Sequence, residues 1–198
     1  MPRASAPALG LLLLLAAGAL PAQTPEPTGT TLRLGFGGNK MDFTCSDCGI
    51  DAETGISAFA AVSAPIGGRF TAGLDVTFAD AGFPTNGAAE GHAKLLAPMA
   101  TAGLRGGSRL PLWGTLGFGW MWYSGIGPSS NGPALSLRAG YDLGIGSLGS
   151  VTPYAGYVTM VGHDGPEVGV NVDPSRPFQI ERTRLGSFQL GISLTPRL

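Results

Sequence analysis

The two cysteines of the chain, Cys45 and Cys48, are only three positions apart and are the first candidates for chemistry. A covalent haem site would need a histidine directly after the second cysteine, where the chain has Gly49. A zinc site would need a second ligand pair with matching spacing, and none is present. A thioredoxin-like centre would need a helix N-terminus beside the thiols, and we expect no helix here. The spacing therefore favours a local disulfide that stiffens a loop.

Acidic residues and histidines are the other candidates for a metal or catalytic site. Four carboxylates near the cysteines could hold calcium through oxygen ligands, but their spacing is not that of an EF-hand, and a solvated acidic loop is the simpler interpretation. They are Asp42, Asp47, Asp51 and Glu53. His92 and His163 fall in expected surface loops, without a serine and an acid in a catalytic pattern. We therefore predict no catalytic residue, no cofactor and no metal.

Four further charges lie on the polar faces of alternating segments, which suggests that they meet inside a folded sheet. They are Arg33, Asp75, Arg138 and Asp142. Buried charges persist in proteins when they are paired, so we expect a closed ion-pair network. A proton or ion path is the alternative, and static packing is the simpler interpretation because a filled interior needs such pairs in any case.

The composition limits the class of protein to which these residues belong. Of 198 residues, 33 are glycine and 13% are charged, whereas soluble domains average about 25% charged residues. Glycine at this level disfavours helices. The net charge is −1 and the basic residues are scattered singly, so we expect no nucleic-acid partner.

The N-terminal residues predict export. Residues 1–22 combine a single charge at Arg3 with an apolar run from Leu9 to Leu20 and then small residues, as in a cleaved signal peptide. Cleavage is expected after Ala22, with Ala19 as an alternative site. The run is too short for a membrane helix, which needs about 20 residues, so an uncleaved anchor is disfavoured. We expect residues 23–30 to form a short tail and residues 31–198 to form one domain.

Eight segments of this domain alternate apolar and polar residues with a period of two, as strands do. In Arg69–Phe78, for example, Phe70, Leu74 and Phe78 oppose Asp75. The expected strands are Thr31–Gly37, Ile56–Ala64, Arg69–Phe78, Lys94–Leu104, Leu112–Tyr123, Leu135–Gly144, Val151–Val161 and Ser187–Thr195. Pro98 and Pro153 suggest a bulge or a rim position within two of them. Long and short connections alternate, with long ones at Gly38–Thr54, Ala79–Ala93 and Gly162–Thr183, which predicts an antiparallel meander.

The direction of the apolar face decides between three architectures. If it pointed inward, as in a lipocalin, the opposite face would meet water and should be rich in lysine and glutamate. That face instead carries glycine, serine, threonine and a few charges, which suit a crowded interior. The apolar faces carry aromatic residues near strand ends, as interfacial girdles do: Phe70, Phe78, Trp120, Trp122 and Tyr141. We therefore predict an eight-stranded antiparallel up-and-down transmembrane β-barrel rather than a lipocalin-like cup or a soluble β-sandwich.

The signal peptide, the alternating segments and the alternating connections together resemble the small eight-stranded outer-membrane β-barrel proteins, the OmpA/OmpX-like transmembrane barrels. The last segment is similar to the family's C-terminal assembly signal in its polar residue Gln189, followed by Gly191 and the apolar Leu194. The resemblance implies location in the outer membrane, contact with its lipids, and recognition of the last strand by the barrel assembly machinery. It also implies external long loops and a lumen filled by side chains, so we expect a monomer and no solute-conducting porin.

We expect a structural or interaction function from these features: envelope integrity, adhesion, or contact with an unidentified ligand through the external loops. Two alternatives remain open at this point. A lipid-modifying barrel enzyme would need a serine, a histidine and an acid together at the lipid rim. A periplasmic lipocalin-like carrier would be soluble without detergent.

Overall fold

A computed structural model describes residues 29–44, 54–83, 91–106, 111–125, 129–161, 168–169, 180–181 and 184–196. These ranges contain eight long strands. They are β1 (Thr31–Thr44), β2 (Thr54–Gly67), β3 (Phe70–Phe83), β4 (Gly91–Arg105), β5 (Leu112–Ser124), β6 (Ser130–Tyr141), β8 (Gly149–Met160) and β11 (Arg184–Pro196). Shorter elements are β7 (Leu143–Gly144), the 3₁₀ turn η1 (Gly146–Leu148), β9 (Val168–Gly169) and β10 (Ile180–Glu181). The described ranges hold no helix long and apolar enough to cross a membrane.

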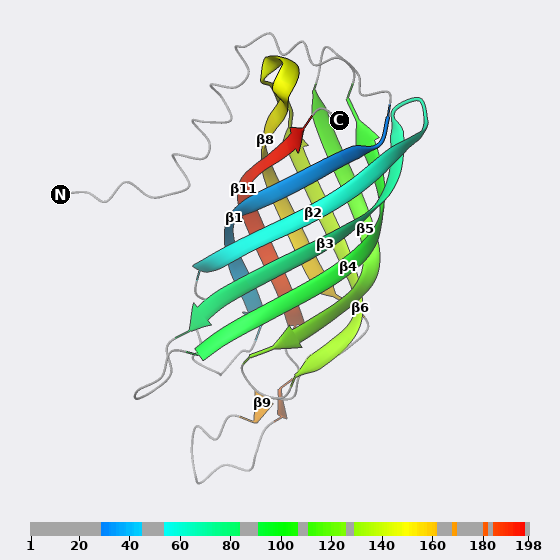
Figure 1. Cartoon of the computed structure of the whole chain (residues 1–198). Helices are drawn as coiled ribbons and strands as arrows, with labels where there is room; N and C mark the ends of the chain where they lie inside the picture. Colours follow the sequence, from blue (N-terminus) through cyan, green and yellow to red (C-terminus); the bar gives the residue numbers. More distant parts are fainter. Residues whose placement is uncertain are drawn as a thin grey trace, which may run out of the picture.

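The long strands form one antiparallel sheet that closes on itself. Neighbours in the sequence pair in the order β1 to β6 and then β8, and β11 pairs with both β8 and β1. Figure 1 shows the tilted strands wrapping around a common axis. Closure removes both sheet edges, so that the strands can satisfy one another's backbone hydrogen bonds. The predicted fold class, an all-β eight-stranded up-and-down barrel, is confirmed.

The two ends of the barrel differ in their connections. At the turn end, which we define by the β2–β3 junction, Gly67 and Gly68 have φ values of 146° and 54°, a backbone region that favours glycine. At the opposite loop end, β1 joins β2 through residues 45–53 and β8 leads to β11 through residues 161–183. The connection from β3 to β4 is residues 84–90, so the prediction of a loop over Ala79–Ala93 was wrong.

All the long strands except β8 run further toward the loop end than the alternation predicts, because the two faces exchange polarity there. On β3 the outward residues Leu74 and Phe78 are exposed and apolar, yet the next outward residue is Asp80, opposite the buried Ala79 and Ala81. On β4 the outward Lys94 likewise neighbours the buried Leu95. A search for apolar residues on one fixed face therefore ends these strands too early.

A layer of apolar side chains fills the interior at the loop end. Its members are Met41, Ala79, Ala81, Ala93, Leu95, Ala97, Met99, Met121, Tyr123, Ala134, Val158, Met160 and Leu185. Met41, Leu95 and Met121 are among the most completely buried side chains of the described residues. The prediction of an interior of glycine, small polar residues and charges therefore holds for the turn-end half and is wrong for the loop-end half.

Pro98 lies in the middle of β4, not at a rim. It pairs with Val76 of β3 on one side. On the other side, neither Ala97 nor Pro98 pairs with a residue of β5. The register is the same on both sides of this gap, from Leu96 with Trp122 to Met99 with Gly119. The expectation of a bulge or a rim position at Pro98 was therefore wrong. Proline has no backbone N–H to give to a neighbouring strand, which accounts for an interrupted ladder without an inserted residue.

Glycine at position 35 makes room for an aromatic ring inside the barrel. A Cβ atom on Gly35 would overlap the ring of Phe59 from the paired strand β2. Phe59 in turn packs edge-on against Tyr154 of β8, with 5.0 Å between ring centroids. The absence of a side chain on β1 thus lets residues from β2 and β8 meet across the lumen.

We predict that Gly35→Val destabilises the barrel by about 1–3 kcal/mol, because the new side chain must displace Phe59 from a packed position. Gly38→Val is the matched control on the same strand, where the nearest atom to an added Cβ is the Gly55 carbonyl oxygen at 3.7 Å. Urea unfolding of the refolded proteins measures the difference. Equal midpoints for the two variants would contradict this account of the packing.

Candidate functional site

The interior at the turn end contains two ion pairs, and the more deeply buried one joins β6 to β3. Arg138 Nη1 donates to Asp75 Oδ2 at 2.8 Å, and Arg138 Nη2 donates to Thr77 Oγ1 at 2.8 Å. The guanidinium carbon lies 3.8 Å from the centroid of the Phe59 ring. The Arg138 and Asp75 side chains are 2% and 1% exposed, so the pair is shielded from solvent.

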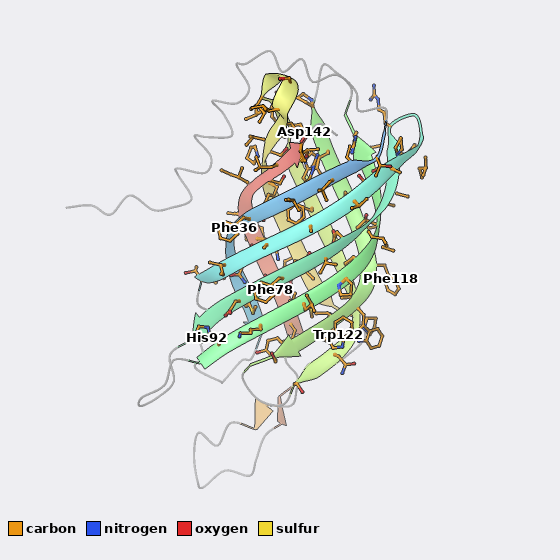
Figure 2. All side chains as sticks on the ribbon, in the orientation of Figure 1. Phe36, Phe78, His92, Phe118, Trp122 and Asp142 are labelled. Carbon is orange, nitrogen blue, oxygen red and sulfur yellow. The ribbon has the colours of Figure 1, made fainter. Side chains whose placement is uncertain are left out.

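The second pair lies closer to the turn end. Arg33 Nη2 donates to both Asp142 oxygens, at 3.1 and 3.2 Å, and Arg33 Nε donates to Thr195 Oγ1 at 3.1 Å. Asp142 also accepts a hydrogen bond from the Thr152 hydroxyl. The Arg33 guanidinium stacks on the ring of Trp113, with its carbon 3.9 Å from the ring centroid. Figure 2 places Asp142 at the turn end of the barrel.

The structure therefore brings the four predicted charges together as two pairs. Among the described residues no hydrogen bond joins Arg33 or Asp142 to Arg138 or Asp75. Each arginine is held by one carboxylate, by a hydroxyl and by an aromatic ring. This arrangement fixes the charges in place, and it also ties β6 to β3 and β1 to the β6–β8 connection across the lumen.

Arg105 is a third interior arginine, which the sequence analysis missed. It is the last residue of β4 and donates from Nη2 to Thr31 Oγ1 at 2.6 Å and to Ser63 Oγ at 3.4 Å. The expected strand ended one residue earlier, at Leu104. The alternation gave a usable signal, because inward positions 95, 97, 99, 101 and 103 lead directly to 105.

A small cavity of about 30 Å³ lies among these groups. Arg33, Arg105 and Arg138 line it together with several hydroxyl groups and the aromatic residues Phe59 and Trp113. The hydroxyls belong to Ser63, Thr71, Thr101 and Thr115. Asp75, the partner of Arg138, also lines the cavity, which therefore combines three arginines and one carboxylate with neutral donors. It has no room for a substrate-sized molecule.

The predicted interfacial aromatics lie on the outer wall, with one partly covered. Phe70, Phe78, Trp120 and Trp122 are 60%, 37%, 43% and 47% exposed. Tyr141, at the turn end of β6, is half-buried. Figure 2 shows Phe118 and Trp122 projecting away from the barrel axis. The aromatic residues therefore divide into an outer set and an inner set, the latter including Phe59, Trp113 and Tyr154 at the turn end and Tyr123 in the apolar layer.

His92 lies within β4, so its predicted place in a loop was wrong. Its Nδ1 atom is 3.0 Å from Asp80 Oδ1 on β3, and its side chain is 55% exposed at the loop end. The described residues contain no group of three or more histidines, cysteines and acids that could hold a metal ion. Cys45, Cys48, Asp47, Asp51, Glu53 and His163 lie outside the described residues, as does the side chain of Asp42.

Comparison with solved structures gives an independent view of the fold. The crystal structure of Neisserial surface protein A (NspA) matches this chain with a TM-score of 0.50, 14% sequence identity, and coverage of 84% of this chain and 96% of NspA. The chain has the barrel fold of NspA. The identity is too low for the comparison to say more than this. No protein-family model matches the chain, and no curated protein matches it.

Two further outer-membrane proteins give weaker matches over similar lengths. Ail, the attachment invasion locus protein of Yersinia pestis, matches with a TM-score of 0.48 and 14% identity, over 85% of this chain and 99% of Ail. OprG from Pseudomonas aeruginosa matches with a TM-score of 0.45 and 10% identity, over 86% of this chain and 97% of OprG.

We predict that Asp75→Ala lowers the stability of the barrel in detergent by about 3–5 kcal/mol, because it leaves the Arg138 charge buried without a partner. The double variant Asp75→Leu, Arg138→Met is the matched control. It removes both charges and should recover most of the loss, since replacing a buried pair by apolar residues is often nearly neutral. Thermal melting in detergent measures both effects, and an unchanged melting temperature for Asp75→Ala would contradict the assigned role.

The same variant should conduct no ions in planar bilayers. The apolar layer begins beside the ion pair, where Met99 of β4 pairs with Asp75 of β3, and extends from there toward the loop end. Its side chains remain in place when the pair is broken and continue to fill the lumen. A conductance step in Asp75→Ala that is missing from the wild type would instead mark the ion pair as the barrier in the lumen.

Proposed function

We propose that this protein is an outer-membrane β-barrel with a structural or interaction role, which contacts its partners through the connections at the loop end. One observation carries the proposal: the outer wall of a closed barrel is covered by exposed large apolar side chains. Those that point outward and are more than half exposed are Phe36, Ile56, Ile66, Phe70, Leu74, Leu104, Leu116, Phe118, Leu137, Leu148, Leu190, Ile192 and Leu194. Water-soluble proteins rarely expose so continuous an apolar surface.

The dimensions of this apolar belt suit the hydrocarbon core of an outer membrane. From Phe70 to Phe78, β3 advances about 27 Å at roughly 3.4 Å per residue. At the tilt of about 40° found in such barrels this corresponds to a height of about 20 Å, near the ~25 Å of known apolar bands. Asp80, His92 and Lys94 lie just beyond the belt at the loop end, where headgroups and water would solvate them.

The filled interior favours this function over transport or carriage. The apolar layer occupies the lumen at the loop end, and ion pairs and aromatic rings occupy it at the turn end. A solute-conducting porin needs an aqueous path, and a lipocalin-like carrier needs an apolar cup that opens to one side. With its apolar surface outside and about 30 Å³ free among the interior charges, the barrel suits neither role.

Export and assembly complete the proposal. Residues 1–22 would be removed as a signal peptide, and Cys45 and Cys48 would form a disulfide in the oxidising compartment that the chain then enters. In β11, Gln189 is fully buried in the lumen and Leu194 is exposed on the wall, as an alternating final strand requires. The assembly machinery would recognise this strand, and a monomer would result.

The His92–Asp80 contact is the observation that bears on an enzymatic alternative. A carboxylate on one imidazole nitrogen orients the ring for acid–base chemistry at the other nitrogen. Among the described residues no serine or threonine hydroxyl donates to His92, so the described ranges offer this pair no nucleophile. The role we assign to these two residues is a contact between β3 and β4 at the edge of the belt.

Fractionation tests the proposal directly. The full chain expressed in a Gram-negative host should sediment with the outer membrane, should require detergent for extraction, and should migrate differently on gels before and after boiling. Recovery in the soluble periplasmic fraction would disprove membrane insertion and would favour the carrier.

We further predict that Leu74→Arg reduces the stability of the barrel in lipid vesicles by about 2–4 kcal/mol, the cost of a charge near the bilayer midplane. Ser124→Arg is the matched control, because Ser124 is exposed at the loop end of β5, beyond the belt, where the cost falls to about 0–1 kcal/mol. Urea-dependent folding into vesicles measures both. A barrel whose wall faces water would tolerate the two substitutions equally.

A further inference from the structure

We propose that the cavity at the turn end binds one small inorganic anion of the size of chloride, with Arg105 as its principal cationic partner. The inference concerns the interior alone and holds whether or not the wall contacts lipid. It begins from the charges around the cavity. Three arginines line it, whereas only two carboxylates lie among the described interior residues of this region, Asp75 and Asp142.

Both carboxylates are already committed to other arginines. Asp142 binds Arg33 through both oxygens and also accepts from the Thr152 hydroxyl. Asp75 binds Arg138 through Oδ2 and accepts a longer hydrogen bond from Thr77 at Oδ1. Neither carboxylate lies within ion-pair distance of Arg105 in the described structure. Among the described residues, Arg105 therefore remains without a carboxylate of its own.

The protein partners of Arg105 are neutral. Its Nη2 atom donates to the hydroxyls of Thr31 and Ser63, and its other side-chain nitrogens make no hydrogen bond within the described ranges. A hydroxyl can orient a guanidinium but cannot neutralise it. In a partly enclosed site the unbalanced charge is costly, and a counter-ion beside it reduces that cost.

The size and lining of the cavity select the kind of anion. About 10–15 Å³ is enough for one water molecule, so a volume of about 30 Å³ holds one monatomic ion together with a water molecule. Thr71, Thr101 and Thr115 add hydroxyl donors to the lining, and hydroxyl and guanidinium groups are the donors that a halide can accept from.

The apolar layer at the loop end confines such an ion to one side of the barrel. Residues such as Met99 and Met121 offer no polar groups to an ion moving along the axis. The anion would therefore enter and leave at the turn end and would act as a structural counter-ion rather than as a permeating one. Its binding should stabilise the folded barrel in proportion to the logarithm of its concentration above the dissociation constant.

Halide substitution in crystals is the first test. Crystals of the full-length protein grown with sodium bromide in place of sodium chloride should show one anomalous peak inside the barrel, in contact with the Arg105 guanidinium. A cavity that holds only water under these conditions would overturn the proposal. This measurement uses the wild-type protein and does not depend on any variant folding.

Thermal melting in detergent is the second test. Replacing chloride by the much larger gluconate at equal ionic strength should lower the melting temperature of the wild type by several degrees. Arg105→Gln should abolish this difference, and Arg69→Gln, in the exposed β2–β3 turn, should preserve it. An unchanged halide dependence in Arg105→Gln would contradict the role of Arg105. If that variant fails to refold, Arg105→Lys keeps the charge and should retain a weaker dependence.

Discussion

The closure of the sheet, with β11 paired to both β8 and β1, is the constraint on which the rest of the structure depends. A closed ladder leaves no edge on which backbone N–H and C=O groups lack strand partners, so the wall no longer needs water to solvate its backbone. Apolar side chains can then cover the outside, and polar ones must go inside. The narrow lumen must then be filled. Ion pairs fill it together with the aromatic rings that stack on them, and glycines leave the space that those rings need.

The polarity of the outward and inward side chains is reversed between the belt and the loop end of the barrel. In the belt, leucine and phenylalanine face outward while Asp75 and Arg138 face inward. Toward the loop end, lysine and aspartate face outward while methionine and alanine pack inside, as in a water-soluble protein. The exchange along a single strand takes place within two residues, from Phe78 to Asp80. In the membrane location that we propose, it marks the level at which the wall passes from hydrocarbon to headgroups and water.

Much of this fold could be predicted from the sequence, because alternation along strands such as Arg69–Phe78 is strong within the belt. The strand ends could not, because the polarity of the two faces reverses beyond the belt, and the alternation therefore places His92 and Met41 in loops. The four interior charges could be predicted from the face of the strand on which each of them lies. Their division into two pairs depends on the register between strands, and the alternation along one strand does not predict that register. Arg105 was missed because its strand was ended one residue short.

Gly35 and Phe59 carry a consequence for the evolutionary history of the barrel. The ring on β2 occupies the space that any side chain on β1 would need, and it also supports the Arg138 guanidinium. Neither position can change alone without either a steric clash or a void beside a buried charge. Among homologous chains the two positions should therefore vary together, and a chain with a bulkier residue at the first should have a smaller one at the second.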